Sequence, residues 1–177
     1  IFLGFHPDIQ HYSAFQPVGL LLRDEHVDLR TAVWVLGKGL RLLDFAHRLN
    51  GVSVGFIDPS NLLFETVHHG VFVLDWSRGS AFNSETARQE VISLAQIVWW
   101  TVGGTAEAEP PLVDEVLAPE GHAQYVAFLR QLIAGELDAG EAHAALYRLS
   151  DQLWAREPIP GTNRTKRHFH LWCTFQR

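Results

Sequence analysis

Residues 54–75 constrain the fold of this chain most, because they combine two short apolar segments with strong turn signals. The first segment, 62–64, is Leu-Leu-Phe, and the second, 71–74, is rich in β-branched and aromatic residues, as strands are. A turn before each segment predicts a β-hairpin. This hairpin would place the oxygen-bearing side chains of Asn61 and Asp75 at one end of a small sheet. Such a pair suits Mg²⁺, a hard cation that usually shares its oxygen ligands with phosphate.

The two turns of this stretch differ in what they suggest. The first, Asp58-Pro59-Ser60-Asn61, consists of residues that form turns, because Pro fixes φ and the Asp and Asn side chains bond to nearby backbone. Asp58 is therefore first of all a turn former, although it is also a carboxylate close to Asn61. The second turn contains His68 and His69, which we expect to point different ways into solvent.

Four other segments have the apolar spacing of helices. In residues 31–49 the apolar side chains recur every three or four positions, and Asn50-Gly51 then marks the end of a helix. An apolar run at 18–22 predicts a leading strand. The fold class predicted is mainly α (α+β), a helical bundle with a small β-hairpin and one or two leading strands. Besides the helix at 31–49, three helices are predicted, at 88–104, at 121–134 and at 139–154. The last of them has Asp138 and Glu141 as a capping box.

Composition limits the classes of function. A chain of 177 residues with 47% apolar residues can bury one real core, and a net charge of −6 argues against a general nucleic-acid binder. No apolar run is long enough to span a membrane. The single cysteine, Cys173, excludes an internal disulfide and fits a reducing, cytoplasmic compartment. The chain begins at Ile1 and contains no Met, which fits a processed or excised fragment.

The last residues, 162–177, form a basic and aromatic tail. We interpret the tail as a segment that docks on the acidic body or on a partner, since it contains no acid. An alternative is a zinc site, although a structural zinc site takes four ligands and only three are in view here. The basic residues are Arg164, Lys166, Arg167 and Arg177, and the three candidate ligands are His168, His170 and Cys173.

The predicted hairpin resembles the catalytic and metal-binding loops of the protein-kinase family, H-R-D-L-x-x-x-N followed by D-F-G. With Asn61 aligned on the kinase Asn, Gly55 takes the Arg place and Phe56 takes the place of the catalytic Asp. Asp75-Trp76-Ser77 stands where D-F-G belongs. The resemblance implies that Asn61 and Asp75 bind Mg²⁺ and nucleotide. Phe56 cannot accept a proton, so the residue that positions the nucleophile is lost. The nearest carboxylate, Asp58, would replace it only in a rearranged loop.

Other parts of the kinase pattern are partly matched. Residues 88–104 resemble the F-helix pattern D-V-x-S-L-G, with Glu90 in the Asp place, and residues 5–9 resemble the H-P-N-I segment. No Gly-rich loop, V-A-I-K lysine or A-P-E is found, and the segment between Asp75 and Glu90 is short. The resemblance divides the chain into remnant N-lobe strands and hinge (1–30), a kinase-like C-lobe (31–157) and the tail (158–177).

The resemblance implies a catalytically impaired, pseudokinase-like domain that acts as a protein-binding regulator or scaffold. The lost base, the absent phosphate-binding parts and the short docking segment together leave little to position a transition state. Residual binding of ATP and Mg²⁺ through Asn61 and Asp75 stays open. The alternative is an active ATP-dependent phosphotransferase for a protein or a small molecule, with Asp58 as base and an N-lobe supplied from outside this chain. We expect a protein partner, and neither nucleic acid nor membrane as a partner.

Overall fold

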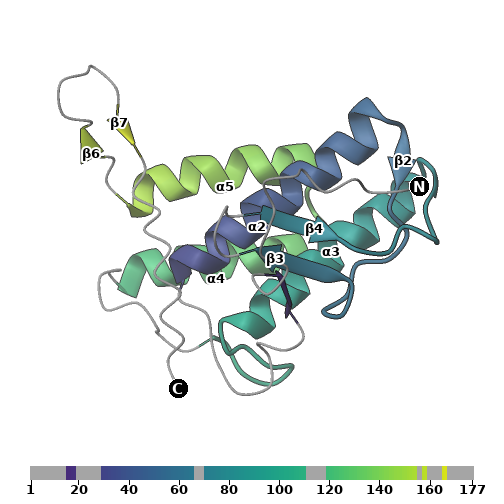
Figure 1. The fold of residues 1–177 in the computed structure, drawn as a ribbon. Helices are drawn as coiled ribbons and strands as arrows, with labels where there is room; N and C mark the ends of the chain where they lie inside the picture. The colour runs from purple at the N-terminus through teal and green to yellow at the C-terminus, as the bar shows by residue number, and fades with distance from the viewer. Residues whose placement is uncertain are drawn as a thin grey trace.

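The structure is a computed structural model, and it describes residues 15–18, 29–65, 70–110, 119–154, 157–158 and 165–166. Helices dominate this part of the chain, and the strands are short and antiparallel (Figure 1). The predicted fold class, mainly α within α+β, is therefore confirmed. The helices are α2 (Leu29–Asp44), α3 (Ser84–Thr101), α4 (Pro119–Ile133) and α5 (Ala139–Leu153).

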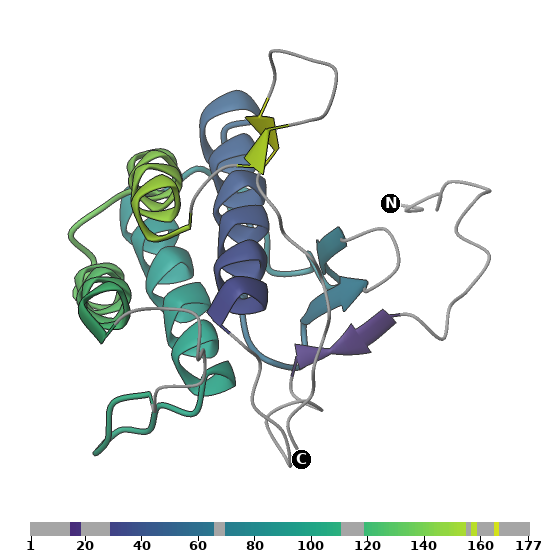
Figure 2. The same cartoon turned by 90° about the vertical axis from the view of Figure 1, so that its left-hand side faces the viewer.

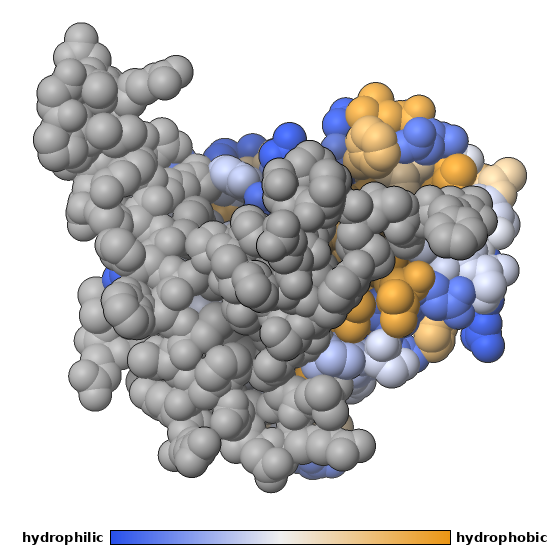
Figure 3. All heavy atoms as spheres, in the orientation of Figure 1, coloured by the Kyte–Doolittle hydropathy of each residue, from blue (hydrophilic) through white to orange (hydrophobic). Residues whose placement is uncertain are grey.

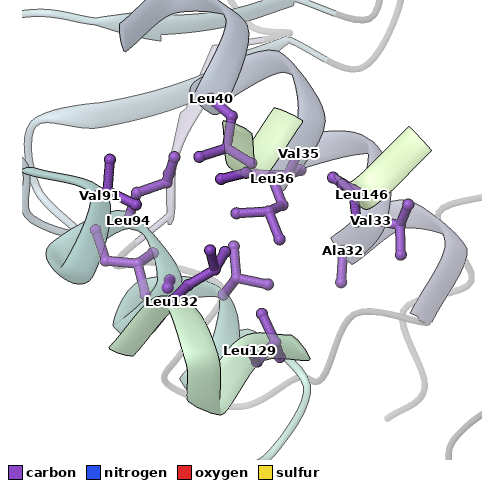
Figure 4. Packing of buried hydrophobic residues seen from close by; sticks show 14 of the residues in the cluster. Ala32, Val33, Val35, Leu36, Leu40, Val91, Leu94, Leu129, Leu132 and Leu146 are labelled. Atoms are coloured by element: carbon purple, nitrogen blue, oxygen red, sulfur yellow. The ribbon is translucent and has the colours of Figure 1, made fainter. Parts of the chain in front are cut away.

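Helix α2 lies at the centre of the molecule. It packs against α3 and α5 on one side and contacts the sheet through β4 (Gly70–Val73) on the other (Figure 2). Helix α4 packs against α3. The side chains between the helices are buried aliphatic groups, and Figure 4 shows them pointing toward one another; they include Leu36, Leu40, Leu94, Leu129 and Leu146.

The helix predicted at 31–49 has two parts in the structure. Helix α2 begins at Leu29 and ends at Asp44, and the chain continues as a π-helical turn, η2 (Phe45–Leu49). The amide of Asn50 closes this turn by donating to the carbonyl of Phe45 at 3.3 Å. Gly51 follows with φ of +61°, so the predicted stop signal is confirmed. The spacing that predicted a helix cannot distinguish the last turn of an α-helix from a π-helical turn.

The predicted hairpin is present. Strand β3 (Leu62–Glu65) pairs antiparallel with β4, with Leu62 opposite Val73 and Glu65 opposite Gly70. His68 and His69 lie outside the described residues.

Of the leading strand predicted at 18–22, the structure describes Val18 alone. Strand β1 (Phe15–Pro17) pairs with β3, whereas Val18 follows the strand and is buried. Residues 19–28 lie outside the part of the chain that the structure describes. The prediction was wrong at Val18 because an apolar run indicates burial but does not locate the backbone pairing.

Two pairs of two-residue strands were not predicted. Strand β2 (Val52–Ser53) pairs with β5 (Ser80–Ala81), and β6 (Glu157–Pro158) pairs with β7 (Thr165–Lys166). Strands this short have no periodicity that a sequence pattern could show. The β2–β5 pair matters for the site, because it brings the turn after Asp75 back against the residues before the hairpin.

The helix starts follow their capping residues. Helix α3 begins at Ser84, earlier than the predicted 88, because the Asn83 side chain accepts from the amide of Thr86 at 2.9 Å. The capping box at α5 is confirmed: Asp138 accepts from the Glu141 amide at 2.8 Å, and Glu141 accepts from the Asp138 amide at 3.1 Å. None of the described helices has the length and apolar character that a membrane crossing requires.

Candidate functional site

The hairpin loop and helix α3 are held together by a buried carboxylate. Glu90 is 3% exposed, and its Oε1 accepts a hydrogen bond from the backbone N–H of Gly55 at 2.5 Å. Its Oε2 lies 2.6 Å from Nε2 of His47, which is also buried. Because His47 belongs to η2 at the end of the central helix, the Glu90 side chain links that turn, helix α3 and the loop. The two segments that resemble kinase motifs therefore lie side by side.

Gly55 lets two loops approach closely. Its φ is +85°, and a Cβ built on it would stand 2.1 Å from the carbonyl oxygen of Arg78, so a larger residue does not fit. The turn after Asp75 is held in this position by its own bonds. Gly79 donates to the carbonyl of Trp76, and the Trp76 indole N–H donates to the carbonyl of Val73, both at 2.9 Å.

Both polar atoms of the Asn61 side chain form hydrogen bonds within the loop. It is 4% exposed, and its Nδ2 donates to the carbonyls of Phe56 at 2.8 Å and of Asp75 at 2.9 Å. Its Oδ1 accepts from the backbone N–H of Asp75 at 2.5 Å. The predicted proximity of Asn61 and Asp75 is thus present. The contact joins an amide side chain to main-chain atoms, so Asn61 closes the loop between Phe56 and Asp75.

The carboxylate of Asp75 is exposed and faces its own turn. Its Oδ1 accepts from the backbone N–H of Ser77 at 2.7 Å. Hydrogen bonds from Ser77 lower the pKa of Asp75, and the charge of Arg78 lowers it further. The side chain is therefore ionised at neutral pH and open to solvent.

Asp58 is the turn former that its sequence context indicates. Its Oδ1 accepts from the N–H and hydroxyl of Ser60, both at 2.6 Å, and from the N–H of Asn61 at 3.0 Å. Partial burial opposes its ionisation, but the hydrogen bonds from Ser60 and Asn61 and the charge of Arg78 together bring the pKa of Asp58 below its ordinary value. One oxygen of this carboxylate is thus bound to three donors of its own turn.

Arg78 is the residue of this site that sequence reasoning missed. Its guanidinium carbon lies 4.9 Å from the centre of the Phe56 ring, in the range of a cation–π contact. Its charge also lowers the pKa of both Asp58 and Asp75. The only signal in the sequence was a cation three residues after Asp75, and its position over Phe56 depends on the β2–β5 pairing.

Residues of the types that bind metal ions lie apart from one another in the described part of the chain. There, no three His, Cys, Asp or Glu side chains gather as a metal cluster would require. His168, His170 and Cys173 lie outside the described residues. Of the two predicted positions for nucleotide or Mg²⁺, Asp75 presents an exposed carboxylate, whereas the side chain of Asn61 is engaged by main-chain atoms of the loop.

Comparison of the chain with known protein families and with curated proteins finds no match.

The turn carboxylate leads to a prediction about pH. The folded-state pKa of Asp58 is below its unfolded value of about 3.9, so Asp58 contributes stability above about pH 4 and loses it as the pH falls further. We expect Asp58→Asn to lower the urea midpoint at pH 7 and to differ less from the parent chain at pH 3. The midpoints at both pH values measure this. A gap of equal size at pH 7 and pH 3 would contradict the role of the ionised carboxylate.

Proposed function

We propose that this chain is a catalytically impaired, kinase-like domain that works as a protein-binding regulator or scaffold. The observation that supports this most is the environment of Phe56. At the position where the resemblance places the catalytic base, the side chain is an aromatic ring with the Arg78 guanidinium over it. Neither group accepts a proton from a substrate hydroxyl at neutral pH.

The nearest carboxylate is a poor substitute for the base. Asp58 would have to give up hydrogen bonds to Ser60 and Asn61 before it could orient a substrate. Its lowered pKa also makes it a weaker base than an ordinary carboxylate. Both facts support binding over phosphoryl transfer.

Residual binding of nucleotide belongs to the same proposal. The exposed carboxylate of Asp75 is the group that would meet Mg²⁺, and Asn61 would keep that residue in place through its main chain. The positive charge of Arg78 lies close enough to both carboxylates to lower their pKa values, so it opposes a divalent cation there. We therefore propose weak binding of Mg²⁺ and ATP at most.

The setting of the protein is proposed on the same grounds. A cytoplasmic location suits a chain with one cysteine, and the net charge of −6 makes a protein partner a better expectation than nucleic acid.

Two measurements test the proposal. Incubated with γ-labelled ATP and Mg²⁺, the purified chain should transfer no label to itself or to generic protein and small-molecule acceptors. Any thermal shift that Mg²⁺ and ATP produce should be small, should disappear in Asp75→Ala and should persist in Glu120→Ala, which removes an exposed carboxylate of α4. A labelled product that Asp58→Asn abolishes would overturn the proposal and establish the phosphotransferase alternative.

A further inference from the structure

A second site lies where the end of α2, the start of α3 and the turn between α4 and α5 meet. Residues of all three segments line a pocket of about 490 Å³. Pockets of roughly 300–1,000 Å³ are the usual size for bound groups. His47 lines this pocket, and beyond it Glu90 binds the loop, so the pocket is distinct from the loop site.

One side of this pocket is apolar and exposed. Phe82 lines it, is 49% exposed, and contacts the His47 ring with 5.8 Å between the ring centres. On η2 next to it, Phe45 and Leu49 are 56% and 72% exposed. Figure 3 shows apolar atoms at the surface at this end of the molecule. Large apolar side chains exposed in and beside a pocket are typical of interaction surfaces.

The charges that line the pocket are unbalanced. Three carboxylates and two guanidinium groups line the pocket, and both guanidinium groups already form hydrogen bonds within the protein. Arg48 forms a bidentate salt bridge with Asp44, with hydrogen bonds of 2.5 and 2.7 Å. Arg88 donates to the carbonyls of Gly135 and Ala134 at 3.0 and 3.1 Å, which closes the end of α4.

The negative charge that remains is available to a ligand. Among the described residues, the exposed carboxylate of Glu136 has no hydrogen bond or ion pair, and Asp138 uses its Oδ1 to cap α5. Glu141, and Glu85 at 3.9 Å from the Arg88 guanidinium, add charge next to the lining residues Gly140 and Ser84. An approaching cation therefore meets a net negative rim beside an apolar wall.

We propose that this pocket docks a basic amphipathic segment of a partner protein. One apolar side chain of the segment enters beside Phe82 and Leu137, and a neighbouring Lys or Arg pairs with Glu136 and Asp138. The overall charge of −6 attracts such a segment before contact. This inference deepens the proposed function, on which it rests, by naming the chemistry of the partner.

Three synthetic peptides test the docking chemistry. Each has about 12 residues and the same Leu and Phe positions, and the polar positions are all Lys, all Gln or all Glu. Fluorescence anisotropy of the labelled peptides with the full chain should show the Lys peptide binding about tenfold more tightly than the Gln peptide, with no binding of the Glu peptide. Equal affinity for the Lys and Gln peptides, or no binding at millimolar concentration, would overturn the proposal.

Matched double variants locate the binding. Phe82→Ser with Glu136→Gln should weaken binding of the Lys peptide about tenfold, because both changes fall in the pocket. Leu74→Ser with Glu120→Gln makes an equivalent change in charge and apolar surface at exposed positions elsewhere and should leave binding within about twofold. Glu136→Lys alone, at an exposed position, should abolish binding without touching the packing. Equal weakening by both double variants would show a diffuse charge effect and refute the site. These binding assays contain no nucleotide, so a negative result can be distinguished from failure of the phosphoryl-transfer test, which uses labelled ATP.

Discussion

Replacing Glu90 with alanine is expected to lower the free energy of unfolding by about 3 kcal/mol, a large part of the stability of a domain this size. The substitution leaves His47 without its partner at 2.6 Å and leaves the N–H of Gly55 without an acceptor. His47 is buried and Gly55 is half-buried, so water replaces the lost hydrogen bonds only in part. Urea denaturation followed by the fluorescence of the six tryptophans measures the loss.

Two controls show whether this loss comes from the hydrogen bonds. Glu90→Gln keeps the shape and an oxygen for Gly55, and its amide can donate to His47, so we expect a loss of about 1 kcal/mol. Glu85→Ala removes a glutamate from the exposed first turn of the same helix and should change stability by less than about 0.5 kcal/mol. If Glu90→Ala were as mild as Glu85→Ala, the carboxylate would not be what joins the loop to the bundle.

Replacing Asn61 with aspartate is expected to cost about 3 kcal/mol, although the two side chains have nearly the same shape. The amide of Asn61 donates to two carbonyls, at 2.8 and 2.9 Å. In the variant a carboxylate oxygen faces those carbonyls in a buried site, so two hydrogen bonds become repulsive contacts. The urea midpoint and the thermal midpoint both report this change.

The same substitution at Asn83 is the matched control. Within the part of the chain that the structure describes, the Asn83 side chain accepts hydrogen bonds at the start of α3 and donates none, so aspartate there is an equally good cap and should be neutral or slightly stabilising. If Asp at position 61 were tolerated and strengthened binding of Mg²⁺, Asn61 would act mainly as a metal ligand, because carboxylates suit that cation. Loss of stability without such binding supports its role in closing the loop.

The helices could be predicted because each has a local signal. The apolar stripe of α2 through Leu36, Leu40 and Leu43 is buried, and the side chains of Asp138 and Glu141 form the predicted capping box. The pairing of β1 with β3 and the β2–β5 pair could not be predicted, because strands of two or three residues are defined by partners far away in the sequence.

The loop site could be predicted only in part. The turn at Asp58 and the hairpin follow from residue types, and together they bring Asn61 and Asp75 to one place. Which atoms of Asn61 and Asp75 meet is a matter of tertiary geometry. The contact of Arg78 with Phe56 also depends on the close approach at Gly55, which the sequence alone does not show. The function that the resemblance to kinases implies stays a prediction.

The side chains of Asn61 and Glu90 hold the loop through hydrogen bonds to main-chain atoms. These atoms are the carbonyls of Phe56 and Asp75 and the amides of Gly55 and Asp75. These atoms are the same whichever amino acid stands at position 56. A lineage can therefore exchange the residue at that position while inheriting the loop intact, so reactivity and architecture are free to diverge.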